Sequence, residues 1–278
     1  MKFRAESLAL LLVLGCQAPR PLPRPERRPE PVLIRAEAIP VDATIPEDPG
    51  VLAALAPIQA RMKAEFGREL CQAPQGLFRG RQGEDENLMG YWIADVMRER
   101  ASAALGRPVP VALTNSGGVR ANLRPGAVTV GAVFEVAPFE NELVVVELTG
   151  SQLARAIRQG LERRAGEPCS GVKASVAGTP EHPLFELRWA DGRPVDPAER
   201  ILVATNDYLA ANGDTMAGLK GSTPIETHVS IRQLLLDACE ALGKAGRPLD
   251  PPAGGRYVVA PELAPLLRAQ KLKLGDRP

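Results

Sequence analysis

The loop Asn115-Ser-Gly-Gly-Val-Arg120 holds the residues of this chain whose types and spacing best suit binding chemistry. It follows an apolar run that predicts a buried strand, and Gly117 and Gly118 let the backbone approach a ligand closely. The Arg120 guanidinium offers planar, bidentate recognition of phosphate oxygens, and the Asn115 amide can donate and accept hydrogen bonds. A glycine turn beside a solvated arginine is the alternative, because a glycine-rich loop by itself is a weak signal.

Two aromatic side chains stand where a predicted strand meets a loop. Phe139 comes just before the apolar strand 142–149, and Tyr208 comes just after the strand 201–205. Only 4% of the residues are aromatic, so two of them at such junctions suggest a shared role. Each ring taken singly is equally compatible with an ordinary core position. The carboxylate of Asp214 follows in the loop after Tyr208.

In this order, the segments 115–120, 137–139 and 206–214 resemble the C-terminal, substrate-specificity domain of the 5′-nucleotidases. The resemblance implies that Phe139 and Tyr208 stack on the two faces of a nucleobase. It also implies ligand contacts for Asn115 at the base, Asp214 at the ribose hydroxyls, Arg120 at a phosphate, and the backbone of Gly117 and Gly118.

The chain departs from the family pattern in two places. A further family arginine precedes the segment that ends here at Gly90; Arg81 is the candidate for it and Arg79 the rival, because the spacing differs by about one residue. Where the family usually has Gly-Gly-Asp-Gly-Phe, this chain has Asn212-Gly-Asp-Thr-Met216. The backbone conformation around Asp214 is therefore left open.

The other half of a 5′-nucleotidase, a two-metal phosphoesterase domain, has no expected counterpart in this sequence. Such a site needs several His, Asp and Asn ligands, whereas the only histidines are His182 and His228, both predicted to be solvated. The carboxylates within 83–86 are more typical of a helix N-terminus than of a cation site. We expect no catalytic residue, metal or other cofactor in this chain, and divalent metals only on a partner catalytic domain.

The N-terminus predicts export and a lipid anchor. A basic start is followed by the apolar run 8–14, which is too short to span a bilayer, and then by Cys16. The Val-Leu-Gly-Cys sequence resembles a bacterial lipobox, which implies cleavage before Cys16 and acylation of that residue. The expected location is the bacterial cell envelope, on its periplasmic or extracellular face. A plain cleaved signal peptide is the alternative.

The chain is expected to contain one folded domain, at 50–260. Residues 1–15 are predicted as a signal peptide and 16–49 as a tether rich in proline and arginine. Residues 261–278 are predicted as a C-terminal tail. About 210 residues suffice for one substantial core.

Composition narrows the class of protein further. The formal net charge of +1 argues against a dedicated nucleic-acid binder, and no serine-hydrolase elbow, P-loop or dinucleotide fingerprint is found. Besides Cys16 the chain has Cys71, Cys169 and Cys239, which permit at most one internal disulfide. The sequence leaves the pair open.

The elements that position these loops alternate between strands and helices. Helices are predicted over 87–105, from Ser151 and from about His228, because apolar residues recur there at helical spacing. The turn Asp191-Gly192 favours a hairpin between the strand 184–190 and its successor. The fold class is α/β (α+β), and the family resemblance implies a layered α/β/β/α sandwich with mixed sheets. Strands are predicted at 109–114, 142–149, 172–177, 184–190 and 201–205.

These inferences predict a lipid-anchored domain that binds a nucleotide or nucleoside phosphate. It would be the substrate-specificity half in nucleotide hydrolysis, with a separate metallophosphoesterase chain as partner, and inactive alone. The alternative is a cell-envelope binding or scaffold protein that kept the fold and lost the ligand. The two differ in one expectation, which is whether Phe139, Tyr208, Asn115 and Arg120 line one pocket or point into separate cores.

Overall fold

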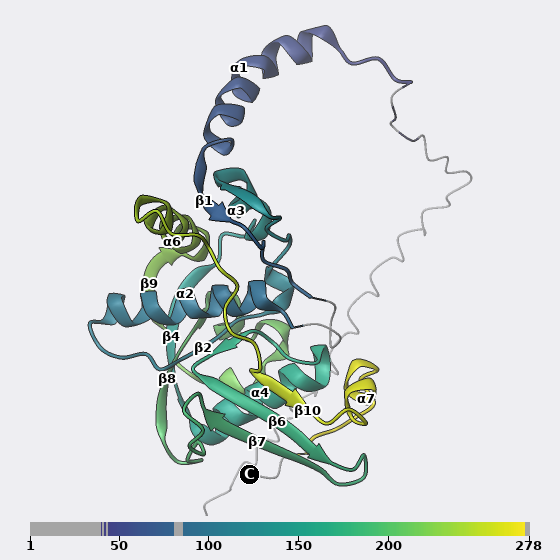
Figure 1. Ribbon diagram of the computed structural model, residues 1–278, viewed down its shortest axis with the longest axis vertical. Coiled ribbons are helices and arrows are strands. Elements are labelled where there is room, and N and C mark those ends of the chain that lie inside the picture. The colour runs from purple at the N-terminus through teal and green to yellow at the C-terminus, as the bar shows by residue number, and fades with distance from the viewer. Residues whose placement is uncertain (1–39, 41, 43, 81–85, 276–278) are drawn as a thin grey trace, which may run out of the picture. The chain divides into compact units, whose positions relative to one another are not determined.

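The computed structural model describes residues 40, 42, 44–80 and 86–275 of the chain. The chain forms two units, Met1–Asp48 and Pro49–Pro278, and the second contains the helices and strands described here (Figure 1). Cys16, Arg81, Glu84 and Asp85, which the sequence singled out, lie outside the described residues.

A five-stranded mixed sheet lies at the centre of the fold, with strand order β5-β2-β8-β4-β9. β2 and β8 run parallel, whereas the remaining pairs in this sheet are antiparallel. Along β4, Leu143 and Val145 face one core while Val146 and Leu148 face another, so both faces of the sheet are buried. The strands are β2 (Val111–Leu113), β4 (Glu142–Thr149), β5 (Cys169–Ser170), β8 (Arg200–Asn206) and β9 (Ile225–Ser230).

Two long helices, α2 (Leu88–Leu105) and α6 (Ile231–Lys244), cover one face of this sheet. The side chain of Asn87 accepts a hydrogen bond from the Gly90 N–H at 2.8 Å and so caps the start of α2. The same core includes α3 (Val130–Val136) and a two-stranded antiparallel sheet of β1 (Glu69–Ala73) and β3 (Gly126–Thr129).

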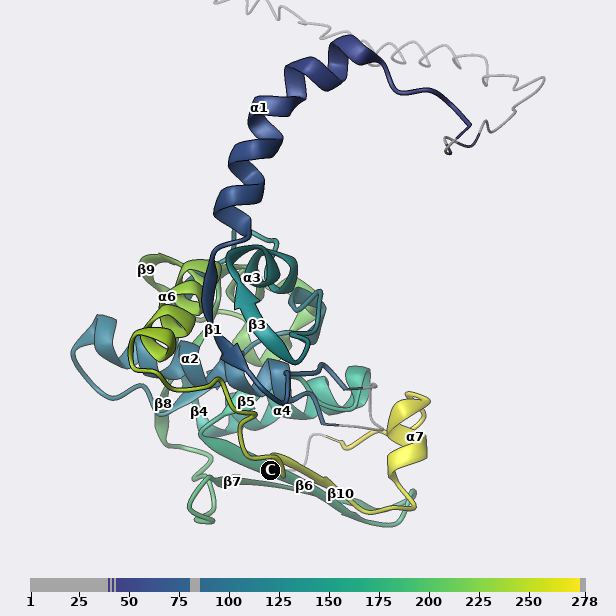
Figure 2. The same ribbon diagram turned by 45° about the horizontal axis from the view of Figure 1, so that its top comes forward.

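The other face is covered by α4 (Gly150–Arg164) and a three-stranded mixed sheet, β10-β6-β7 (Figure 2). Thr149 and Gln152 form a reciprocal capping box at the start of α4. The segment expected as a tail after residue 260 contributes buried leucines to this core, including Leu263 and Leu274. The bounds are β6 (Val172–Gly178), β7 (Pro183–Trp189), β10 (Tyr257–Val259) and α7 (Ala264–Arg268).

This architecture is the mixed α/β class with mixed sheets that the sequence predicts. The third predicted helix starts later than expected: α6 begins at Ile231 rather than near His228. His228 belongs to β9 and has φ of +57°, at an irregularity in the pairing of β4 with β9. A left-handed residue there bends the strand, so the helix can start only after the strand has ended.

The hairpin predicted between β7 and β8 is wrong, because these strands belong to different sheets. The Asp191-Gly192 turn does reverse the chain, and the Trp189 N–H donates to the Arg193 carbonyl at 2.8 Å. The return is limited to an isolated bridge between Arg188 and Pro194, flanked by a second hydrogen bond from the Val195 N–H to the Leu187 carbonyl at 3.2 Å. The chain then turns again and enters the five-stranded sheet as β8.

The helix α1 (Pro49–Phe66) precedes the domain, and none of its side chains is buried. Its last residue, Phe66, packs against Phe134 of α3 with the ring centroids 4.9 Å apart. Among the helices in the described part of the chain, none has the length and apolarity that a membrane crossing requires.

Candidate functional site

The loop after β2 is held by its first residue, Asn115. Because β2 and β8 are parallel neighbours, their carboxyl ends lie at the same edge of the sheet. There the buried Asn115 Oδ1 accepts a hydrogen bond from Asn206 Nδ2 at 3.0 Å, and Asn115 Nδ2 donates to Asp214 Oδ2 at 3.3 Å. The short turn η1 (Ser116–Gly118) follows at once. Asn115 therefore joins the loops that follow two strands.

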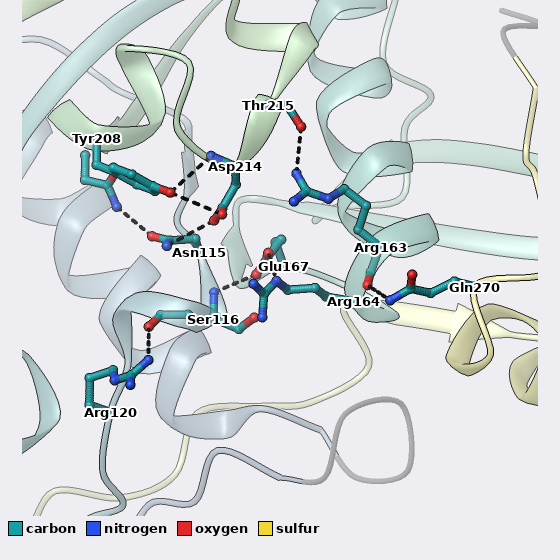
Figure 3. A network of polar contacts seen from close by, with 12 residues as sticks. Asn115, Ser116, Arg120, Arg163, Arg164, Glu167, Tyr208, Asp214, Thr215 and Gln270 are labelled. Carbon is teal, nitrogen blue, oxygen red and sulfur yellow. Dashed lines mark hydrogen bonds and ion pairs between the residues drawn. The ribbon is translucent and has the colours of Figure 1, made fainter. Parts of the chain in front are cut away.

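The loop after β8 carries Tyr208 and Asp214 to the same place. Tyr208 lies in the short helix α5 (Asp207–Ala210), and Asp214 lies in the turn η2 (Gly213–Thr215), which η3 (Ala217–Leu219) follows. The Tyr208 hydroxyl donates to Asp214 Oδ1 at 3.3 Å, and the Asp214 N–H approaches the same hydroxyl at 3.3 Å (Figure 3). A Cβ on Gly213 would stand 2.6 Å from the Tyr208 ring. Only glycine fits there.

The backbone around Asp214 is left-handed at every non-glycine position from Asn212 to Thr215. Asn212, Asp214 and Thr215 have φ of 72°, 52° and 51°. The 5′-nucleotidase pattern usually has glycine at the places of Asn212 and Thr215, and glycine adopts such angles without strain. The loop thus keeps a glycine-like conformation although these residues disfavour it. The strain is greatest at Thr215, because its side chain is β-branched.

Replacing Thr215 by glycine is therefore expected to raise the free energy of unfolding. A left-handed backbone costs a residue with a Cβ roughly 1–2 kcal/mol, and the greater freedom of glycine in the unfolded chain cancels part of the gain. We expect a net increase of about 1 kcal/mol in urea unfolding. Asn212→Gly is the matched control with a smaller effect, because asparagine tolerates this region. If the Thr215→Gly protein were less stable than its parent, the left-handed backbone at Thr215 would not be a source of strain.

A cavity of about 590 Å³ opens between these loops and the segment before β4. Phe139 lies in that segment and is 48% exposed, and Tyr208 is 46% exposed. The Arg120 guanidinium lies 5.9 Å from the centre of the Phe139 ring, and Arg120 Nη1 donates to the Gly117 carbonyl at 3.2 Å. The predicted binding residues among the described part of the chain all line this cavity: Asn115, Gly117, Gly118, Arg120, Phe139, Tyr208 and Asp214.

The cavity also has lining residues that sequence reasoning missed: Glu140, Asn141 and Arg164. Arg164 lies in the last turn of α4, where a basic residue is ordinarily explained by the helix dipole. Its Nη2 would be 3.7 Å from a Cβ on Gly117, so the guanidinium lies against the glycine loop. No local sequence pattern points to it, because α4 and the loop meet only in the folded chain.

Glu167 is a buried carboxylate behind the same loop, and no sequence pattern singles it out. One oxygen accepts a hydrogen bond from the Ser116 N–H at 2.6 Å, and the other lies 3.4 Å from Arg164 Nε (Figure 3). Burial raises the pKa of the Glu167 carboxyl, and the nearby Asp214 charge adds to this, while Ser116 and Arg164 oppose it. Glu167 therefore fixes both the loop and the arginine.

Other residues singled out by the sequence do not line the cavity. Arg79 donates from Nη1 to the Arg120 carbonyl at 3.4 Å but does not line the cavity. His182, in the turn between β6 and β7, is exposed. His228 is also exposed, with Nδ1 3.7 Å from Glu142 Oε2. Within residues 44–80 and 86–275, no three His, Cys, Asp or Glu side chains are grouped as metal ligands.

Known proteins resemble this chain over the part that builds the cavity. The family model for the 5′-nucleotidase C-terminal domain matches residues 69–221. The trifunctional nucleotide phosphoesterase protein YfkN of Bacillus subtilis is 35% identical over 142 residues, 46% of this chain and 9% of that protein. The cell wall protein Lmo0130 of Listeria monocytogenes is 30% identical over 149 residues, 49% of this chain and 19% of that protein.

A solved structure gives the same result for the fold. The crystal structure of the 5′-nucleotidase precursor from Thermus thermophilus has a TM-score of 0.63 and 27% sequence identity, over 76% of this chain and 42% of that chain. The chain thus spans less than half the length of these proteins. The family match runs from β1 past Asp214 and includes every strand end that carries a cavity loop. The chain belongs to the 5′-nucleotidase C-terminal domain family.

Proposed function

We propose that the chain binds a nucleotide or related nucleoside phosphate in the cavity between the loops. The base stacks between Phe139 and Tyr208, and the phosphate lies toward Arg120 and Arg164. One observation carries this proposal: residues chosen from separate segments of the sequence line a single cavity of about 590 Å³. Ligand pockets for small molecules have roughly 300–1,000 Å³.

The polar groups of the cavity support the roles of the individual residues. Each Asp214 oxygen accepts one hydrogen bond, from Asn115 and from Tyr208, and a carboxylate retains lone pairs for two ribose hydroxyls. Arg120 directs Nη1 to the Gly117 carbonyl, and a guanidinium has further donors for phosphate oxygens. The two half-exposed rings present apolar faces without filling the cavity.

The biochemical role that follows is the substrate-specificity half of nucleotide hydrolysis. The metallophosphoesterase half, with its divalent metals, is on a separate chain, because a two-metal site uses several His and Asp ligands and this sequence has only the histidines His182 and His228. Relatives named as a nucleotide phosphoesterase and a 5′-nucleotidase support this role. The chain alone does not hydrolyse nucleotides.

Calorimetric titration tests the proposal. The purified chain is titrated with AMP, GMP, CMP and UMP, and phosphate release is measured in parallel with manganese, zinc or cobalt. We expect binding of the nucleotides without hydrolysis above background. Absence of binding at millimolar ligand would favour the alternative, an envelope scaffold that lost its ligand. Metal-dependent hydrolysis that persists through repurification would show that catalysis needs no partner chain.

We also propose that acyl groups on Cys16 hold the chain in the bacterial cell envelope. Support comes from the apolar run that ends at Gly15-Cys16 and from a relative named as a cell wall protein. Several acyl chains anchor a protein stably, at about 0.8 kcal/mol for each buried methylene.

Cys16→Ser is expected to abolish labelling of the protein by radioactive palmitate in a bacterial host. Because the thiol that takes the lipid is lost, the precursor should also remain uncleaved, since the lipoprotein peptidase needs the modified cysteine. Cys169→Ser, which changes a buried cysteine of β5, is the matched control and should be labelled normally. A Cys16→Ser protein that is cut at the same place and released would instead indicate an ordinary signal peptide.

A further inference from the structure

Cys71 and Cys239 are far apart in the sequence and lie beside each other in the fold. Cys71 belongs to β1 and Cys239 to α6, and both are buried in the same core. α6 lies next to β1 in both views of the chain (Figures 1 and 2). One turn beyond Cys239, a Cβ on Gly243 would stand 3.6 Å from the Cα of Cys71 and overlap the Leu70 carbonyl. The backbones of the helix and the strand therefore meet closely.

The two thiols are close enough to influence each other's ionisation. This contact lowers the pKa of the Cys71 thiol, while the same contact and burial raise the pKa of the Cys239 thiol. In an attack on a disulfide, the thiolate is the reactive form. Either thiolate of the adjacent pair can attack a disulfide, and the other thiol is then placed to resolve the intermediate.

The third cysteine in the described residues, Cys169, is separated from this pair. It lies in β5 and faces the other core of the five-stranded sheet, where its sulfur approaches the Val172 carbonyl at 3.9 Å. Burial raises the pKa of the Cys169 thiol to about 11, so it is a poor nucleophile. The fold therefore selects one pair among the three that the sequence left open.

We propose that Cys71 and Cys239 form a disulfide bond when the chain folds in an oxidising compartment. The oxidant is a disulfide, such as oxidised glutathione. The thiolate of one of the two cysteines attacks one glutathione sulfur and releases the first reduced glutathione; the sulfur of the other cysteine then displaces the second. The two thiol protons are transferred to the two glutathione thiolates, and the protein is oxidised by two electrons. This inference rests on the proposed export and is independent of nucleotide binding.

The bond would hold β1, the first strand of the domain after α1, in place. β1 pairs only with β3 among the described strands, and it follows α1, which has no buried side chain. A covalent link from β1 to α6 would add a covalent connection between this two-stranded sheet and the helix with which it shares a core. A bond that closes so long a loop also restricts the unfolded chain strongly.

Peptide mapping tests the pairing. The full chain with Cys16→Ser is refolded in reduced and oxidised glutathione, alkylated without reduction and digested with trypsin. Cys71 then lies in the peptide 69–79, Cys239 in 233–244 and Cys169 in 165–173. We expect 69–79 and 233–244 to be linked and 165–173 to be alkylated. The link should persist in Cys169→Ala and disappear in Cys71→Ala and Cys239→Ala.

Thermal unfolding gives a second, independent measurement. Reduction of the refolded chain should lower Tm by roughly 5–10 °C, given the stabilisation typical of long closed loops, and should not change the Tm of Cys71→Ala. Alkylation of all three cysteine peptides after refolding, or a link that includes 165–173, would overturn the proposal. A Tm that is insensitive to reduction despite the link would overturn its stabilising role.

Discussion

Replacement of both Phe139 and Tyr208 by alanine is expected to lower the affinity of the chain for nucleoside monophosphates by roughly 100-fold or more. Stacking of a base on one aromatic side chain contributes about 1–3 kcal/mol, and the proposed clamp uses two rings. The loss should be similar for AMP, GMP, CMP and UMP, because every base has a π face. Calorimetric titration of the parent and the variants measures it directly.

Two control variants separate stacking from other effects of the substitutions. Phe78→Ala removes a ring of similar exposure, 47%, that does not line the cavity, and should leave affinity unchanged. Tyr208→Phe keeps the ring and removes only the hydroxyl that contacts Asp214, so it should retain most of the affinity. If the double alanine variant bound AMP as tightly as the parent, the base would lie elsewhere.

The secondary structure and the loops of the cavity were predictable because their signals are local. The apolar runs of β4 and β8 mark buried strands, and α2 shows a double row of apolar residues at helical spacing. Asn115 and Tyr208 each follow such a strand directly. Residues at strand ends are positioned by the sheet alone, so a strand assignment already places them near one edge.

The features that the sequence did not predict depend on contacts between distant segments of the chain. Glu167 reaches the Ser116 N–H because β5, which begins two residues later, pairs antiparallel with β2, and nothing near Glu167 in the sequence indicates that. The pairing of β7 was also misassigned, because a turn signal states that the chain reverses but not which sheet the next strand joins.

Removal of the guanidinium of Arg164 is expected to weaken AMP binding about 10-fold to 100-fold while leaving adenosine binding nearly unchanged. A hydrogen bond to a charged group contributes about 1.5–3 kcal/mol, and adenosine has no phosphate to accept it. Arg120→Ala should behave alike. Arg164→Lys should recover only part of the affinity, because an ammonium group keeps the charge without the planar fork.

The matched control for Arg164→Ala is Arg155→Ala, an exposed arginine of the same helix that does not line the cavity. It makes the same change in net charge and should leave both affinities unchanged. Arg164→Ala also deprives buried Glu167 of its ion-pair partner, so thermal unfolding must accompany the titration. A loss of affinity that is equal for AMP and adenosine would mean that Arg164 only holds the glycine loop in place. A loss confined to AMP would show that Arg164 binds the phosphate. Arg164 belongs to α4 and meets the glycine loop only in the folded chain.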